Sequence, residues 1–590
     1  MSGKWFNESH QPFRPALINL AGRPVEPMMK WRIFEYILFP LFTVTLFFLL
    51  SMIFISEDQA ITIGGDSFGH MADYSLQKKG LQKSDICVCL ENKGGNRFKP
   101  FRNFIKKGFI AMSDSPSQFI NAQFIVYTLA PFFLSYYFCR SIIGRRAFSV
   151  PLSLILAFTL AFSSFNILHL LTGHFSFFPL FVLVWLFLFY RFYLNPNNFN
   201  TTALGLGFGI NAIFNPYYGY FGVFLYPFFI GYILIYDRER FRNLFKKLAV
   251  SFLISGALVI SIQAPVLLKS LTAHSQPKGT VFNRPASTIT GIAPWNYLMP
   301  APTHLAASES YSTFYRKMMA QSNVPENAVY LGMVNLFFFG YGIYLYFMNR
   351  LCSRGRFWFR FVFGAGICYL FLSLPPNIDL GNGKKIDLIS PYLHAIFPMF
   401  RTFGRTGLFV LIFVSIGSMI GFYHFLHNCG KKAPTVVAAA LILSLIDLAP
   451  RLPTLDIGKH PPVYDWLKNQ KGNFLIYEIP EDYTGRRTDN FQQYKFRFYQ
   501  AIHGKKLANR GISNYDPQSK VFYQTLKKLG VKYLVQHKNL YQEGPLPQEY
   551  KKFDSIPAAA VQFNEGVIEN FPEWFVPAAT IGEANVYEVY

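Results

Sequence analysis

A carboxylate and a histidine lie in a glycine-flanked segment shortly after the first long apolar run of the chain. Residues 61–70 read Ile-Thr-Ile-Gly-Gly-Asp-Ser-Phe-Gly-His, so Asp66 and His70 are four residues apart and would share a face of a helix. A carboxylate at a membrane–water boundary can act as a general base on a substrate whose other end lies in the bilayer. Gly-Gly-Asp-Ser is also good turn chemistry, which leaves a simple loop turn as the alternative.

Histidine and asparagine side chains follow at two later turns. His169 and His174 are five residues apart with no carboxylate near them in the sequence, a pattern that favours polar lining of a cavity over metal binding. Asn211 and Asn215 lie at the end of a short apolar run. Polar groups at that depth face a cavity or the interior of a helix bundle rather than lipid.

Two arginines stand where a late apolar run begins. Arg401 and Arg405 are one helical turn apart, and two guanidinium groups on one face suit a phosphate or pyrophosphate. Snorkelling to lipid head groups is the alternative. The aromatic and proline-rich segment 292–304 contributes Trp295 and His304 as candidate cavity residues. A Trp/Tyr belt at the membrane interface explains that segment equally well.

The composition indicates a polytopic α-helical membrane protein. The chain has 590 residues, of which 51% are hydrophobic and 15% charged, and 66 are Phe. Its apolar residues form about eleven runs, most of them of the length that crosses a bilayer as a helix. The run at 204–214 is the shortest and the least regular. The runs cover 34–55, 119–139, 148–165, 175–193, 204–214, 220–236, 248–268, 329–347, 357–374, 407–425 and 434–448.

Basic residues in alternate short loops predict the orientation. Short turns at 166–174 and 215–218 carry no Lys or Arg, so we expect them outside. Loop 56–117 is also basic, but long loops cross the membrane largely regardless of charge. The N-terminus is therefore expected in the cytoplasm, with Asp66 and the chain after the eleventh run outside. The basic clusters are Lys30 and Arg32; Arg140, Arg145 and Arg146; Arg238, Arg240, Arg242, Lys246 and Lys247; Arg350, Arg354, Arg356 and Arg360; and Lys431 and Lys432.

The runs divide the chain into three parts. Residues 1–33 form a polar cytoplasmic segment without the features of a cleavable signal. Residues 34–450 form the transmembrane module, with large outer loops at 56–117, 269–328 and 375–405. Residues 451–590 are expected to form an extracytoplasmic α/β domain, in which 472–479 and 531–536 are strands and 519–530 an amphipathic helix.

Charge and cysteine content exclude some alternatives. The net charge of +24 is spread over clusters that flank the apolar runs, which favours anionic lipid head groups over nucleic acid. Of the six cysteines, Cys87 and Cys89 are expected in a strand, and the other four are expected as packing residues in or beside spans. No metal-ligand spacing surrounds the pair at 87 and 89.

Short motifs in collinear order resemble the YfhO-type branch of the GT-C membrane glycosyltransferase superfamily. The likeness covers nearly the whole chain. The matching pieces are Gly-Asp-Ser-Phe-Gly-His at 65–70, the turn that contains His174, Pro-Trp-Asn-Tyr-Leu-Met-Pro-Ala-Pro at 294–302, Val-Tyr-Leu-Gly at 329–332, Phe-Arg-Thr-Phe-Gly-Arg at 400–405, Val-Tyr-Asp-Trp-Leu at 463–467, His-Gly at 503–504 and Leu-Gly-Val-Lys-Tyr-Leu at 529–534.

The resemblance implies transfer of a sugar from a polyprenyl-phosphate-linked donor, with the acidic residue matched by Asp66 as the base. A second acidic residue that some members carry beside it has no clear match, so use of a divalent cation stays open. The expected partners are the lipid-linked donor, a glycan, polymer or protein acceptor and the membrane, with no nucleic acid. The expected location is the bacterial cytoplasmic membrane.

Physical reasoning supports an inverting transfer. The base and the leaving group would lie on opposite faces of the sugar, the lipid phosphate would need fixed cations, and no second carboxylate stands out as a covalent nucleophile. A transporter or lipid-linked-sugar flippase is the main alternative. Neither an internal repeat nor a charge in mid-span supports it. A non-catalytic scaffold that presents the C-terminal domain is the third.

Overall fold

The computed structural model describes the chain in segments. They are residues 59–62, 66–78, 100–143, 148–174, 178–272, 286–318, 324–379, 385–458, 460–479, 491–508, 520–537, 575–582 and 584–589. The expected first span at 34–55, Cys87 and Cys89, and the side chain of Asp66 lie outside the described part. The chain divides into two compact units, Met1–Leu50 and Ser51–Tyr590, and every described residue belongs to the second.

Every expected apolar run from residue 119 onward coincides with one or two helices. The side chain of Ser163 caps α7 by accepting a hydrogen bond from the backbone N–H of Asn166. The side chain of Asn197 caps α9 by accepting from the backbone N–H of Asn200. These helices are α5 (Pro116–Ile143), α6 (Ser149–Ala161), α7 (Ser164–Leu171), α8 (Phe178–Leu194), α9 (Asn198–Phe214), α10 (Pro216–Val223), α11 (Leu225–Tyr236), α12 (Arg238–Leu271), α15 (Met333–Phe347), α16 (Ser353–Ser373), α18 (Gly407–Cys429) and α19 (Ala433–Leu448).

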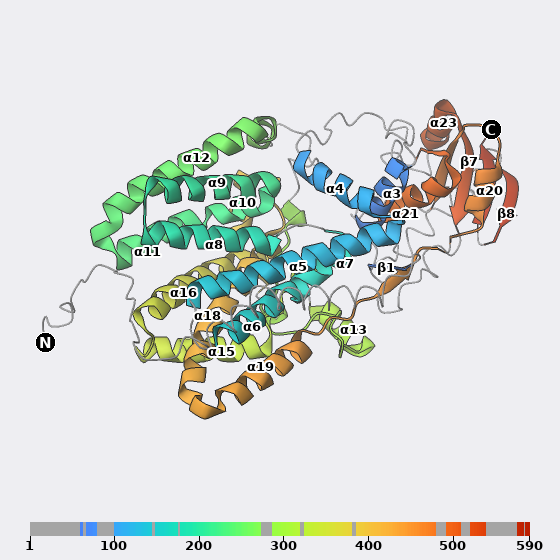
Figure 1. The fold of residues 1–590 in the computed structure, drawn as a ribbon. Helices are drawn as coiled ribbons and strands as arrows, with labels where there is room; N and C mark the ends of the chain where they lie inside the picture. Colours follow the sequence, from blue (N-terminus) through green and yellow to red (C-terminus); the bar gives the residue numbers. More distant parts are fainter. Residues whose placement is uncertain are drawn as a thin grey trace, which may run out of the picture. The chain divides into compact units, whose positions relative to one another are not determined.

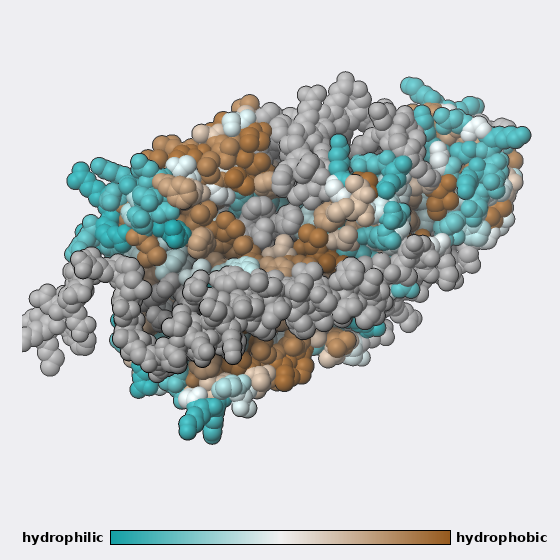
Figure 2. Space-filling view, in the orientation of Figure 1, coloured by the Kyte–Doolittle hydropathy of each residue, from teal (hydrophilic) through white to brown (hydrophobic). Residues whose placement is uncertain are grey.

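Several of these helices are long and apolar enough to cross a bilayer. In the described part of the chain, the qualifying segments are Pro116–Ser141, Pro216–Tyr236, Arg238–Ile262, Gly355–Ser373 and Phe403–Leu448. The pair α6–α7, bent by 42°, would add one more. Figure 2 shows the apolar surface gathered over the helices and hydrophilic surface over the C-terminal sheet. A total of eleven spans stays a prediction.

Aromatic rings and small residues pack the helices together. A Cβ on Gly421 of α18 would lie 2.1 Å from the backbone oxygen of Phe338 on α15, so only glycine permits this approach. The rings of Phe338 and Phe422 stack beside it with centroids 3.9 Å apart. The abundant phenylalanines therefore fill the interior between closely spaced backbones.

The expected outer loops contain short elements of their own. In the first loop lie β1 (Gln59–Ile61), α3 (Asp66–Lys78) and α4 (Pro100–Met112). The second contains η4 (Ala286–Thr288), η5 (Pro294–Tyr297), α13 (Glu309–Met318) and α14 (Val324–Asn327). The third contains β2 (Asn377–Asp379), β3 (Lys385–Asp387), α17 (Ile389–Ile396) and η6 (Phe403–Thr406), and η7 (Gly430–Lys432) turns the chain between α18 and α19.

A five-stranded mixed sheet forms the C-terminal domain. Its strand order is β6-β5-β7-β9-β8; β6, β5 and β7 are parallel, β9 is antiparallel to β7, and β8 is antiparallel to β9. Its strands are β5 (Leu475–Ile479), β6 (Lys506–Leu507), β7 (Val531–His537), β8 (Phe575–Ile581) and β9 (Ala584–Val589), and its helices are α20 (Val463–Asn469), α21 (Phe491–His503) and α23 (Lys520–Leu529). The expected strands at 472–479 and 531–536 and the helix at 519–530 are confirmed.

One strand joins this domain to the helical part. Strand β4 (Thr454–Asp456) pairs with β1 in an antiparallel ladder, with Ala60 opposite Leu455.

The turn between α11 and α12 lies at the end of the helices that is remote from the sheet (Figure 1). The basic cluster that begins at Arg238 is therefore separated along the helices from the C-terminal sheet.

Candidate active site

The N-terminus of α3, where Asp66 is the first helical residue, is tied to two other helices. The hydroxyl of Thr62 donates to the backbone oxygen of Leu171 at the end of α7 (2.7 Å) and lies 2.8 Å from the hydroxyl of Ser67. The buried side chain of Asn121 on α5 accepts from the backbone N–H of Ile61 at 2.7 Å and donates to the backbone oxygen of Gln59 at 3.0 Å. Residues 59–62 are thus bound to α5 and to the end of α7.

His70 and His174 both contact the turn that follows α7. Nε2 of His70 lies 3.1 Å from the backbone oxygen of Gly173. Because a carbonyl oxygen can only accept, this nitrogen is the donor. The hydroxyl of Thr172 lies 3.0 Å from Nδ1 of His174. The ring centres of His169 and His174 are 5.7 Å apart. Together with the contact of His70 to Gly173, this distance places all three histidines at one turn.

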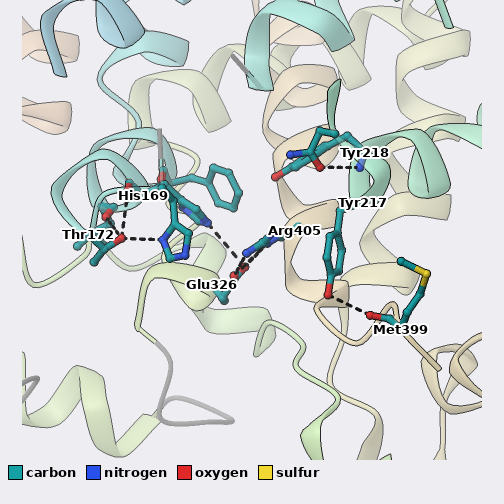
Figure 3. A network of polar contacts seen from close by, with 11 residues as sticks. His169, Thr172, Tyr217, Tyr218, Glu326, Met399 and Arg405 are labelled. Carbon is teal, nitrogen blue, oxygen red and sulfur yellow. Dashed lines mark hydrogen bonds and ion pairs between the residues drawn. The ribbon is translucent and has the colours of Figure 1, made fainter. Parts of the chain in front are cut away.

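A buried ion pair lies beside this turn (Figure 3). Nη2 of Arg405 donates to Oε1 of Glu326 at 2.7 Å, and Nε lies 3.0 Å from Oε1 and 3.2 Å from Oε2. The side chain of Glu326 is 4% exposed and that of Arg405 is 16% exposed. One edge of the guanidinium group is therefore committed to the carboxylate.

The ion pair fixes the ionisation of Glu326. Burial by itself raises the pKa of the Glu326 carboxyl, but the Arg405 guanidinium and His169 together outweigh burial and hold this pKa well below its usual range. Nδ1 of His169 donates to the backbone oxygen of Phe165 at 2.7 Å. Its Nε2 lies 3.7 Å from Oε2 of Glu326, which is a favourable contact when that nitrogen is protonated and too long for a hydrogen bond.

Tyr217 and Asn215 support the other face of Arg405. The guanidinium carbon of Arg405 lies 4.8 Å from the centre of the Tyr217 ring, a cation–π distance. The Tyr217 hydroxyl donates to the backbone oxygen of Met399 at 3.1 Å. Asn215, expected as a cavity residue, caps the N-terminus of α10 by accepting from the backbone N–H of Tyr218. Asn215 thus caps the helix that contains Tyr217.

The two arginines do not share a helical face. The expectation that Arg401 and Arg405 lie one helical turn apart on one face is wrong, because η6 begins at Phe403 and α18 at Gly407. Arg401 precedes both, and its backbone oxygen accepts from the N–H of Thr290 at 2.9 Å. Its side chain is partly buried. The segment is locally non-helical because it pairs with residue 290 of another loop.

Trp295 and His304 bind to other elements. The indole N–H of Trp295 donates to the backbone oxygen of Met318 at the end of α13. Nε2 of His304 donates to the backbone oxygen of Ile446 on α19 at 3.1 Å. Within the described segments, neither side chain forms a hydrogen bond or ion pair with Glu326 or Arg405.

The sequence did not reveal the acidic partner of this site. Glu326 lies more than 70 positions from Arg405 and more than 150 from His169 in the chain, and neither its neighbours nor its spacing mark it as buried. His169 has no carboxylate near it in the sequence. In the folded chain, however, its Nε2 lies 3.7 Å from Oε2 of Glu326. Among the described residues, no group of three or more His, Cys, Asp or Glu side chains is arranged to hold a metal ion.

Comparison with known proteins gave structural similarity alone. Neither a protein-family model nor a curated protein matches the chain. Among solved structures, arabinofuranosyltransferase AftD from Mycobacteria is 13% identical with a TM-score of 0.48, over 92% of this chain and 39% of AftD. ArnT from Cupriavidus metallidurans in the apo state is 11% identical with a TM-score of 0.45, over 93% of this chain and 98% of ArnT.

A further structure, of ArnT from the same organism bound to undecaprenyl phosphate, has a TM-score of 0.36 at 11% identity, over 92% of this chain and 97% of ArnT. The chain spans about two-fifths of the length of AftD. Because these TM-scores lie below 0.5, the function proposed below is argued from the residues of this chain.

Proposed function

We propose that the chain is a GT-C glycosyltransferase of the YfhO type, which moves a sugar from a polyprenyl-phosphate-linked donor to a cell-envelope acceptor at the outer face of the bacterial cytoplasmic membrane. One observation carries the proposal: the helix that begins with Asp66 is fastened to the His169–His174 turn, which contacts the Glu326–Arg405 pair beside an apolar helix. The helix that begins with Asp66 is thus joined to a turn with imidazoles and a fixed cation, which supports a site for an anionic donor at this turn.

Asp66 is the general base in this proposal. Its carboxylate takes the proton of the acceptor hydroxyl as the oxygen attacks the anomeric carbon, and the bond from that carbon to the phosphate oxygen breaks. The products are the glycosylated acceptor and the polyprenyl phosphate, and the anomeric centre is inverted. Residues 59–62 are anchored through Thr62 and Asn121, which limits how far the start of α3 can move.

Arg401 and Arg405 stabilise the charge that develops on the leaving phosphate. Glu326 occupies the Nε–Nη2 edge of Arg405, so a contact of this residue with phosphate would use the remaining N–H groups of Nη1 and Nη2. Arg405 contributes mainly a fixed positive charge, which acts without reorganisation during the reaction.

Release of polyprenyl phosphate by the purified protein tests the proposal. The probes are synthetic undecaprenyl-phosphate-linked hexoses and pentoses in lipid nanodiscs, with total cell-envelope glycan as the acceptor. Removal of a positioned base costs about 10²–10⁴-fold in rate, so Asp66→Asn should lower turnover by that factor while donor binding persists.

Asp73→Asn is the matched control on the same helix. Its carboxylate pairs with Lys106 at 2.7 Å and is partly exposed, so we expect turnover within about threefold of wild type, in line with the small energy of such pairs. Near-normal transfer by folded Asp66→Asn protein would remove Asp66 from the mechanism. Donor movement across the membrane without any release of polyprenyl phosphate would favour the flippase instead.

A further inference from the structure

The C-terminal domain contacts the helix that carries the proposed base. Helix α21 lies beside α3 (Figure 1), and Phe498 of α21 belongs to the same buried cluster as Met71, Ala72 and Tyr74 of α3. Phe498 is 6% exposed, and both Met71 and Ala72 are fully buried. A side chain of the sheet domain therefore forms part of the packing of α3.

Helix α21 joins two cores at once. Phe496, two residues before Phe498, is buried in the core of the sheet domain together with Ile476 of β5 and Val535 of β7. Tyr499 packs against both clusters. Because the two faces of α21 are committed to different cores, a shift of the sheet domain is transmitted to α3.

The distance from this contact to the proposed base is short. Ala72 is six residues after Asp66 in α3, which corresponds to roughly 9 Å along the helix axis at about 1.5 Å per residue. A helix is stiff over this length. The pairing of β1 with β4 supplies a second connection, immediately before the Asp66 segment.

We propose that the C-terminal domain positions α3, with Phe498 as the positioning residue that sets the place of the Asp66 carboxylate. This inference rests on the glycosyl transfer proposed above. Phe498 touches neither substrate nor reacting atoms. Loss of its ring leaves a cavity in the buried cluster that Phe498 shares with Met71 and Ala72, and a displacement of about 1 Å at a reacting group can cost about 10²-fold in rate.

Phe498→Ala and Phe522→Ala form a matched pair of variants. Phe522 of α23 is 1% exposed and belongs to a cluster on the sheet that contains no residue of α3. Both changes remove a buried phenyl ring and so weaken the C-terminal domain. Only Phe498, however, belongs to a cluster that includes residues of α3. Phe498→Leu restores most of the volume and should recover the wild-type behaviour, even if Phe498→Ala folds poorly.

Hydrogen exchange of the peptide that covers Asp66–Lys78 and the rate of polyprenyl-phosphate release are measured on the full chain in nanodiscs. We expect Phe498→Ala to raise exchange in this peptide and to lower kcat by about 10–10²-fold, with donor KM within about twofold. Phe522→Ala should change neither, and Phe498→Leu should restore both.

Equal effects of the two alanine variants on the α3 peptide would overturn the proposal, because general loosening of the domain would then explain them. Wild-type exchange in Phe498→Ala would overturn it as well. If the wild-type protein transfers no sugar from any donor, the proposed function fails. The exchange comparison then decides on its own whether Phe498 positions α3.

Discussion

Removal of both charges of the Glu326–Arg405 pair should destabilise the protein by less than the sum of the two single removals. The carboxylate of Glu326 receives three contacts from the guanidinium group at 2.7–3.2 Å and is almost fully buried. When one partner becomes neutral, the other keeps its charge without compensation in a buried site. Neutralising the second partner then removes this penalty.

The geometry sets the size of the effect. Two unit charges about 4 Å apart attract by roughly 4 kcal/mol at an effective dielectric constant of about 20. Loss of one partner of a buried pair typically costs about 3–5 kcal/mol. For Glu326→Gln and Arg405→Gln we expect a coupling free energy of about 2–3 kcal/mol, at the upper end of values for residues in contact.

Thermal unfolding midpoints of the two single variants and the double variant, in one detergent at one pH, form the assay. The unfolding midpoint of the double variant should fall by less than the two single decreases added together. Asp73→Asn and Lys106→Gln provide the control cycle, since that pair is more exposed and should couple by less than about 1 kcal/mol. Additive decreases for Glu326 and Arg405 would refute the description of the two as a compensated buried pair.

Three further predictions concern pH, packing and orientation. Because the pKa of Glu326 is depressed in the folded protein, its stabilisation is fully present above the ordinary glutamate pKa of about 4.3 and is lost as the pH falls toward the depressed value. The gap in unfolding midpoint between wild type and Glu326→Gln should therefore be constant from about pH 5.5 to 8 and shrink below about pH 4; narrowing between pH 8 and 6 would contradict this. Gly421→Ala should cost about 1–3 kcal/mol, whereas Gly340→Ala, whose Cβ meets nothing within 4 Å, should be tolerated; equal thermal shifts would count against the close approach of α15 and α18. In a chain freed of native cysteines, a cysteine at the exposed position of Val521 should react with an impermeant reagent on intact cells, and one at Lys432 only after lysis; the reverse pattern would invert the orientation.

The helices and part of the sheet could be predicted from the sequence because both are encoded locally. A run of apolar residues such as 407–425 predicts a helix on its own, and α18 occupies Gly407–Cys429. The segment 531–536 predicts a strand by composition and its position after a glycine, and β7 occupies Val531–His537. Each prediction needs only neighbours in the chain.

The contacts that build the site could not be predicted because they join distant segments. Glu326 meets Arg405 and His169, and Gln59 of β1 pairs with Asp456 of β4. Spacing within a segment carries no signal of such pairing. The same limit explains the arginines: a spacing of four residues suggests one helical face, but the bridge between Thr290 and Thr402 keeps the chain non-helical there.

The two halves of the site are held by different kinds of support, and this bears on their proposed roles. Arg405 is fixed by a carboxylate at 2.7 Å and by the Tyr217 ring, so its charge is available at a constant position whether or not substrate is bound. The Asp66 helix is fixed by hydrogen bonds at its start and by apolar packing further along, part of which comes from Phe498 in another domain. Apolar packing yields to a modest force more readily than a buried ion pair does. Any adjustment of the site to its acceptor should therefore move the base relative to a stationary cation, and the α21–α3 contact is where such an adjustment would begin.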